Sequence, residues 1–465
     1  MDALTSGGRR AAGPGQGASG PASPAADGAA HAAGVAASAA DGAAHAAGVA
    51  ARDAYGRLLA LLAASTSDLA AAEDALADAF ERALRTWPSA GVPGNPDAWL
   101  LTVARNRLRD HWKSAHVQRA LPGTALPGEG GQDEPVHFDP VYFNEVDVDA
   151  IPDRRLELML VCAHPAIERA VRTPLMLNTV LGFTAEQVGR AFSVPASTMA
   201  TRLVRAKKRI KAARIPFHVP DRDDLVARMN AVLEAVYGAY VIDWATTGPQ
   251  ARQLPAEALH LAEVLVALVP ADPEAHGLAA LVQLSAARAP ARVDANGRFV
   301  PLADQDPSLW NARLIGRAHE HLRAAHTRGQ LGRFQVEAAI QAVHCARQHG
   351  AGTDWPTLLT LHRLLDAVAP SLGSGVALAA VTAEVDGPAA GLTALDALLE
   401  DAGPQARRFQ PARATRAHLL DQLGRSEEAV AAYEGAIALT HDTAERQYLQ
   451  HRRDRASRQG HHGSP

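Results

Sequence analysis

Residues 184–214 read TAEQVGRAFSVPASTMATRLVRAKKRIKAAR, and this stretch decides how the chain is interpreted. Its first nine residues are typical of a short amphipathic helix with Val188, Ala191 and Phe192 on one face. The turn that follows contains a proline, which suits the first turn of a new helix. This second helix has an apolar stripe formed by Met199, Leu203, Ala206 and Ile210.

The opposite face of the second helix is basic, because residues 196–214 contain seven Lys or Arg and no Asp or Glu. A helix-turn-helix needs an apolar side that fixes the angle between its helices, small polar residues early in the second helix, and cations that meet phosphate. The stretch meets all three requirements. A solvated basic helix in an ordinary helical protein has the same pattern, so the rest of the chain has to distinguish the two interpretations.

The composition of the whole chain predicts an all-α protein. Its 465 residues suggest about three domains. Hydrophobic residues make up 47% and aromatic residues only 5%, and the abundance of Ala and Leu favours helix nearly throughout. The net charge is −4, so a surface for nucleic acid has to be a local concentration of cations.

The absence of several motifs disfavours whole classes of function. Cys162 and Cys345 are far apart and lack a CxxC pattern, which disfavours a disulfide framework or a zinc site and fits a reducing cytoplasm. Cys162 and His164 lie among apolar residues and are more typical of a core than of metal ligands. We find no P-loop, dinucleotide-binding, HExxH or GxSxG motif, so we expect no enzymatic activity, catalytic residue, metal or cofactor. We also expect a cytoplasmic protein without a membrane span.

Residues 1–45 are mostly Ala, Gly, Ser and Pro, and the segment ADGAAHAAGVAA occurs twice, at residues 26–37 and 40–51. Few of these side chains can bury enough apolar area to offset the entropy lost on ordering. We therefore expect a disordered extension over residues 1–45.

Residues 46–120 predict a helical unit with one acidic and one basic surface. The helix expected at residues 68–87 exposes a stripe formed by Glu73, Asp74, Asp78 and Glu81. In the helix expected at residues 97–116, exposed cations are interleaved with the amide of Asn106 and with the rings of His111 and Trp112. That mixture suits melted nucleic acid, because bases stack on rings while cations hold the backbone. Each surface alone is also typical of an ordinary solvated face, and for the isolated acidic helix that interpretation is the favoured one.

The order of these segments resembles the bacterial RNA polymerase sigma factors of the extracytoplasmic-function type. The segment AEDALADAF…AWLLTVARNRLRD resembles their second region, and TPLMLNTVLGFTAEQVGRAFSVPASTMATRLVRAKKRIKAA resembles their fourth region. Further on, RVDANGRFVPLADQDPSLW and GRFQVEAAIQAVH are similar to the subgroup with a long TPR-like C-terminal extension, whose hallmark Gln305, Asp306 and Trp310 match.

The resemblance implies two small helical sigma domains followed by a TPR-like α-solenoid. The expected boundaries are region 2 at 46–120, an acidic linker at 121–150, region 4 with the helix-turn-helix at 151–216, the TPR-like domain at 221–445 and a disordered tail at 446–465. The linker, rich in Gly, Pro and acidic residues, is typical either of a plain spacer or of an acidic strand that mimics nucleic acid.

The resemblance also implies roles for individual residues. Core RNA polymerase would bind Asp74, Asp78, Phe80 and Glu81. The melted −10 strand would be held by the loop at 87–95 and by Trp99, Arg105, Asn106, Arg107, Arg109 and Lys113. The −35 major groove would receive Ser197, Thr198, Thr201, Arg202, Arg205, Lys207, Lys208 and Arg209.

Beyond residue 220, repeated helical stretches predict an α-solenoid, with Ala429, Tyr433 and Ala436 where a TPR packs its second helix. Stacked helix pairs offer a concave surface, so a protein partner is expected there beside core RNA polymerase and promoter DNA. The expected function is a sigma factor. The alternatives are a TPR-type scaffold whose DNA-binding half is vestigial, and a helix-turn-helix regulator that does not act through polymerase.

Overall fold

The structure is a computed structural model that describes residues 40–51, 54–120, 153–192, 194–244, 254–350 and 352–462. Every regular element in these ranges is helical, and their one β feature is an isolated bridge between Val293 and Phe299. The prediction of an all-α fold is confirmed.

After a helix at residues 40–51, the α-helices of the N-terminal half are α2 (Tyr55–Thr66), α3 (Leu69–Ala90), α4 (Pro96–Ala120), α6 (Arg155–Cys162), α7 (Arg169–Thr179), α8 (Ala185–Ala191) and α9 (Ala196–Ala212). The C-terminal half contains α10 (Arg222–Trp244), α11 (Leu254–Leu268), α12 (Pro273–Ala287), α13 (Ala312–His326), α14 (Arg333–Cys345), α15 (Trp355–Val368), α16 (Leu372–Asp386), α17 (Pro388–Ala402), α18 (Gln410–Gln422), α19 (Ser426–Ile437) and α20 (Thr443–His462). Short 3-10 helices η1 (Ala289–Ala291), η2 (Leu302–Asp304), η3 (Pro307–Leu309), η4 (Ala346–His349) and η5 (Gly403–Arg408) join them.

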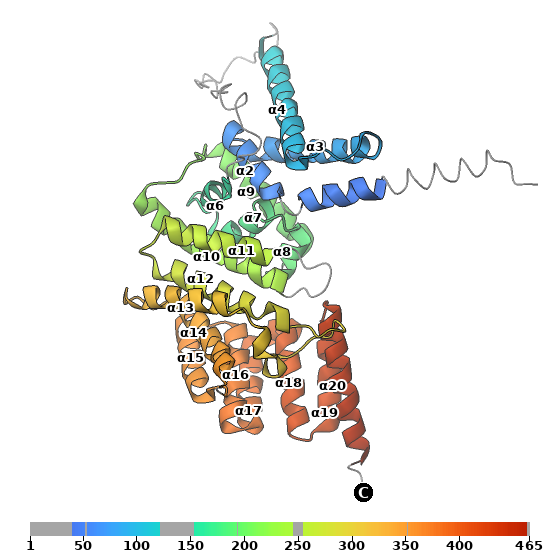
Figure 1. Ribbon diagram of the computed structural model, residues 1–465, viewed down its shortest axis with the longest axis vertical. Coiled ribbons are helices and arrows are strands. Elements are labelled where there is room, and N and C mark those ends of the chain that lie inside the picture. Colours follow the sequence, from blue (N-terminus) through green and yellow to red (C-terminus); the bar gives the residue numbers. More distant parts are fainter. Residues whose placement is uncertain are drawn as a thin grey trace, which may run out of the picture.

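The helices form three successive groups along the long axis of the molecule (Figure 1). Helices α2, α3 and α4 lie at the top, α6 to α12 lie in the middle, and α13 to α20 lie at the bottom. One buried apolar core runs from Ala43 to Cys345, through the first two of these groups and into α13 and α14. The N-terminal and central helices therefore pack as one body, in which α2 contacts α6, and α7 contacts α10.

The C-terminal helices pack as consecutive neighbours. A second core, from Val376 to Ala456, is shared by α16 to α20, and a smaller one, from Val336 to Val381, joins α14, α15 and α16. Tyr433 is fully buried between neighbouring helices, with Ala429 and Ala436 beside it. These contacts agree with the helical pairing expected for residues 426–439.

Both ends of the chain contain more helix than the composition predicted. Residues 40–51 are helical, and Ala43, Ala47 and Ala50 are buried in the first core, so the predicted disorder over residues 1–45 was wrong from residue 40 onward. The prediction of a disordered tail at residues 446–465 was also wrong over most of that range, because α20 extends to His462. Its Leu449 and Ala456 are buried, and Arg452 pairs with Asp421 at 2.8 Å.

The segment at residues 292–310 is packed against η4 and α20. Arg347 donates to the carbonyl oxygens of Leu302 at 2.6 Å and Ala303 at 2.9 Å, and its guanidinium lies over the ring of the buried Trp310. Phe299 meets the ring of Tyr448 edge to face. The hallmark residues Gln305 and Asp306 make local hydrogen bonds, so packing accounts for this segment.

Helix α10 is the most apolar long helix among the described residues. Residues Asp223–Ile242 are long and apolar enough to cross a membrane by length and composition, and half of their apolar window is buried inside the fold. Because a core helix of a soluble protein has the same properties, this is weak evidence for a span.

Candidate nucleic-acid and polymerase interface

Helix α3 presents three of the four residues of the predicted acidic stripe to solvent; the prediction was wrong for Glu73, which is largely buried against Lys207. Asp68 caps the helix by accepting a hydrogen bond from the backbone N–H of Ala71 at 3.1 Å. The opposite face is buried and consists of Leu69, Ala72, Ala75, Leu76, Ala79 and Ala83. Asp74 and Glu81 are exposed, whereas Phe80 is half-buried and packs against the core.

The two predicted surfaces of this N-terminal unit touch each other. Asp78 of α3 accepts a hydrogen bond from Arg107 Nε of α4 at 2.5 Å, and both side chains are substantially exposed. A residue expected to bind polymerase is therefore paired with one expected to bind the −10 strand. On α4, Asn106 is exposed and Arg109 half-buried, while burial lowers the pKa of Arg105. The side chain of Lys113 lies outside the described part of the chain.

The loop expected at residues 87–95 is shorter than predicted. Helix α3 continues through Pro88 to Ala90, so only residues 91–95 connect it to α4. Trp87 is buried, and its ring meets that of Trp99 edge to face at 5.5 Å between centroids. Trp99 therefore presents only part of its ring as a stacking surface.

Helices α8 and α9 are joined by a short connection, as the sequence predicts. Thr184 and Gln187 form a capping box at the start of α8. The predicted stripe of α9 is buried throughout: Met199, Leu203, Ala206 and Ile210. The prediction for α8 was wrong in part, because only Val188 is buried, whereas Ala191 and Phe192 are exposed where the helix ends and the chain leaves the helical repeat.

Seven of the eight residues predicted to contact the −35 element are exposed on α9: Ser197, Thr198, Thr201, Arg202, Arg205, Lys208 and Arg209. The exception is Lys207, which is half-buried. Its Nζ donates to both carboxylate oxygens of Glu73 at 2.7 and 2.9 Å and to Asn178 Oδ1 at 3.0 Å. In this conformation Lys207 is engaged inside the molecule, so its predicted phosphate contact is not available.

A second ion pair and a close backbone approach reinforce this contact between the two halves of the N-terminal body. Lys211 Nζ lies 2.7 Å from Asp68 Oδ2. Gly56 of α2 lies so close to the end of α7 that a Cβ atom there would come within 1.8 Å of the carbonyl oxygen of Val180. Helices α2 and α3 are thus docked on the unit formed by α6 to α9.

Cys162 and His164 have packing roles, as expected. The Cys162 thiol is buried 3.6 Å from Thr179 Oγ1, and burial raises its pKa to about 12. His164 Nδ1 accepts a hydrogen bond from the backbone N–H of Ala166 at 3.0 Å. Among the described residues, no group of three or more His, Cys, Asp or Glu can hold a metal ion. The acidic linker predicted at residues 121–150 lies outside the described residues.

In the comparisons with known proteins, two separate segments of the chain match described families. Residues 51–117 match the family described as Sigma-70 region 2, and residues 228–326 match a family of unknown function (DUF6596). An uncharacterized protein of Rhizobium meliloti is 35% identical over 381 residues, which cover 81% of this chain and 88% of the relative. The chain belongs to the same family as this rhizobial protein. No solved structure matches the chain.

Helices α2, α3 and α4 thus form a sigma-70 region 2 domain. This domain carries the acidic stripe of α3 and the cations of α4. The matches to described families cover neither the α8–α9 pair nor the helices beyond residue 326. DNA binding by α9 and a TPR-like character of the C-terminal helices therefore stay predictions.

Proposed function

We propose that this protein is a sigma factor that binds core RNA polymerase and directs it to promoters with −35 and −10 elements. The observation that carries the proposal is the sigma-70 region 2 match at residues 51–117, followed along the chain by the basic helix α9. Polymerase binding and promoter binding are each assigned to a separate surface. We assign the protein no enzymatic role and place it in the cytoplasm with the polymerase.

Polymerase binding is assigned to the exposed face of α3. Asp74 and Glu81 give this face negative charge beside the partly exposed ring of Phe80. Complementary charge steers association and fixes orientation more than it supplies affinity, while a partly buried aromatic ring supplies apolar contact. Asp78 belongs to the same face but also holds Arg107, so its substitution would disturb α4 as well.

Promoter binding is assigned to α4 and α9. The first turns of α9 expose Ser197, Thr198 and Thr201, short polar side chains suited to base edges, while Arg202 and Arg205 follow one turn later. Arginine reads guanine in the major groove through two hydrogen bonds, and further cations such as Lys208 hold phosphate. The exposed Asn106 and Arg107 of α4 are assigned to the melted −10 strand.

The C-terminal helices are assigned a protein partner. Their consecutive packing in α15 to α20 supports a TPR-like arrangement, in which stacked helix pairs expose a concave face. The match to a family of unknown function covers most of α10 and all of α11, α12, η1 to η3 and α13, and it does not include α15 to α20.

The proposal is tested with Asp74→Lys combined with Glu81→Lys. We expect this variant to lose co-purification with core polymerase and run-off transcription, while its helix content and DNA binding stay unchanged. The matched control is Glu400→Lys with Asp401→Lys, two exposed acidic residues at the end of α17. A wild-type protein that binds promoter DNA but never associates with polymerase would instead identify a conventional helix-turn-helix regulator.

A further inference from the structure

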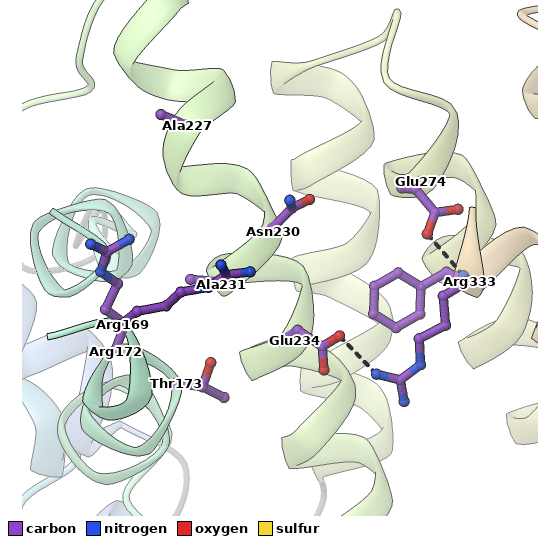
Figure 2. A pocket seen from close by; sticks show the side chains of 10 residues that line it. Arg169, Arg172, Thr173, Ala227, Asn230, Ala231, Glu234, Glu274 and Arg333 are labelled. Carbon is purple, nitrogen blue, oxygen red and sulfur yellow. Dashed lines mark hydrogen bonds and ion pairs between the residues drawn. The ribbon is translucent and has the colours of Figure 1, made fainter. Parts of the chain in front are cut away.

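An open cleft lies where α7 meets the C-terminal half of the chain. It has a volume of about 530 Å³ and is lined by Arg169, Arg172, Thr173, Ala227, Asn230, Ala231, Glu234, Glu274, Arg333 and Phe334. Small-molecule sites in proteins commonly occupy this range of volume and often lie between domains. Figure 2 shows Arg169 and Arg172 extending from α7 on one side, with Glu234, Glu274 and Arg333 on the other.

The charged side chains on the far wall are engaged within the protein. Arg333 pairs with Glu234 and with Glu337, each at 2.7 Å. The Glu274 carboxylate accepts hydrogen bonds from the backbone N–H groups of Phe334 at 2.9 Å and Gln335 at 3.2 Å, and so caps α14. These groups therefore hold each other in place. Because Glu234, Glu274 and Glu337 outnumber Arg333, this wall is net negative, and the positive charge of the cleft lies on the α7 side.

The charges on the α7 wall are not neutralised. Arg169 and Arg172 lie one turn apart at the start of α7, and neither forms an ion pair with a residue that the structure describes. Arg172 donates to the carbonyl oxygens of Ile167 at 3.0 Å and Pro165 at 3.3 Å, which fix its guanidinium without compensating its charge. Partial burial, together with Arg169 and Arg228, lowers the pKa of Arg172.

The start of α7 adds to the positive potential that Arg169 and Arg172 create. The first turn of a helix carries unpaired N–H groups and the positive end of the helix dipole, which disfavour two cations and favour an anion. Glu168, the residue before α7, is exposed and caps none of these groups with its side chain. The Asn230 amide and the Thr173 hydroxyl add hydrogen-bonding groups next to the arginines, while Ala227 and Ala231 line the floor with methyl groups.

We propose that this cleft binds a small anionic molecule, whose phosphate or carboxylate group lies between Arg169, Arg172 and Asn230. The rest of the molecule lies over the alanines of α10, towards Phe334. Such a ligand bridges α7, which packs on α9, and the helices of the C-terminal half. Binding is independent of the proposed function, because it requires neither polymerase nor DNA.

The test is isothermal titration of the full chain with sodium pyrophosphate, citrate and AMP at one fixed ionic strength. Comparing pyrophosphate and AMP with citrate distinguishes recognition of phosphate from recognition of carboxylate. Comparing AMP with pyrophosphate shows whether the ring of the ligand contacts the protein. We expect a single site of sub-millimolar affinity for at least one probe, with thermal stabilisation that grows with its concentration.

Arg169→Gln and Arg172→Gln are each expected to weaken that binding about tenfold, as a lost charge-assisted hydrogen bond does. Arg313→Gln removes an exposed arginine of α13 and is expected to change nothing. Arg169 is exposed and makes none of the backbone hydrogen bonds that Arg172 makes. If Arg172→Gln does not fold, Arg169→Gln therefore still tests whether the cleft binds an anion. The proposal is overturned if none of the three probes binds, if binding is unchanged in Arg169→Gln, or if that variant loses affinity only for duplex DNA.

Discussion

Lys207 Nζ of α9 lies 2.7 Å from Glu73 Oε1 of α3, and the two side chains are only 16% and 19% exposed. The pair connects the helix assigned to the −35 element with the helix assigned to polymerase. Burial raises the pKa of Glu73, and Lys207 offsets part of that effect. Removing one partner of such a pair leaves an uncompensated charge in a poorly solvated place, which is more costly than losing the pair as a whole.

This contact has a consequence for promoter binding. On B-form DNA, elements about 25 base pairs apart are separated by roughly 85 Å, at 3.4 Å per base pair. Helices α3 and α9 contact each other here, so the region 2 domain and α9 cannot reach both elements of a straight promoter in this conformation. Under the proposed function, the Lys207–Glu73 contact therefore has to break on a promoter.

Glu73→Lys and Lys207→Glu are each expected to separate α3 from α9, because each places two like charges together in the same partly buried site. The double exchange restores opposite charges and is expected to restore the contact. Dyes on Arg85→Cys and Arg202→Cys, both at exposed positions, report the distance by energy transfer, since Cys162 and Cys345 are buried. Lys208→Glu is the matched control. An unchanged distance in both single variants would contradict the prediction.

Gly56→Val is expected to weaken the docking of α2 on α7 by at least about 2 kcal/mol, because the added Cβ overlaps the carbonyl oxygen of Val180 and the backbone has to move. Gly316→Ala is the control, since a Cβ there has nothing within 4 Å; a helical Gly→Ala change of this kind is expected to stabilise by about 0.5–1 kcal/mol. Urea unfolding midpoints of the two variants measure the difference. Equal midpoints would show that the approach of α2 to α7 is not tight in solution.

The sequence predicted the elements with strong periodicity and missed the contacts between distant ones. The stripe of α9 was correct at every position because Met199, Leu203, Ala206 and Ile210 follow the helical repeat. The α3–α9 contact joins residues 134 positions apart, and no local pattern encodes such pairing. One signal was available: Glu73 lies four residues after Leu69 and three before Leu76, on the edge of the buried face.

Composition misled the prediction at both ends of the chain. Residues 40–51 consist mainly of Ala and Gly, yet the buried Ala43, Ala47 and Ala50 recur at helical spacing and pack on the core. In α20 the average is strongly polar, yet Leu449 and Ala456 lie one above the other on one face. A few well-placed side chains decide whether a segment packs, and an average over the segment does not record their spacing.

Arg202→Ala and Arg205→Ala are each expected to lower the slope of log K against log salt for promoter binding by about one unit if the side chain meets phosphate. If the side chain instead reads a base, discrimination against the wrong base falls while the slope changes less. Fluorescence anisotropy at several salt concentrations separates these outcomes. Arg313→Ala, on α13, controls for the change in net charge. Slopes equal to that of the wild type, with unchanged specificity, would remove α9 from the DNA interface.

Stability is expected to fall below neutral pH, and His344 is expected to cause a measurable share of the loss. The side chain is largely buried in α14, with its ring near that of Trp355. Burial, reinforced by Arg288, His362 and Arg347, lowers its pKa from 6.5 to about 4. Between these two values the unfolded chain binds a proton that the folded chain does not. Stability is therefore complete above pH 6.5 and is lost as the pH falls towards 4.

For this one residue the loss between pH 7 and pH 5 is about 2 kcal/mol. Burial also lowers the pKa of His276, His362 and His418, so the wild type is expected to lose more than that in total. His344→Gln is expected to have a flatter dependence of the urea midpoint on pH, whereas His451→Gln, at an exposed position of α20, is expected to follow the wild type. If the midpoint of His344→Gln fell as steeply as that of the wild type, His344 would have to be protonated in the folded protein at pH 5.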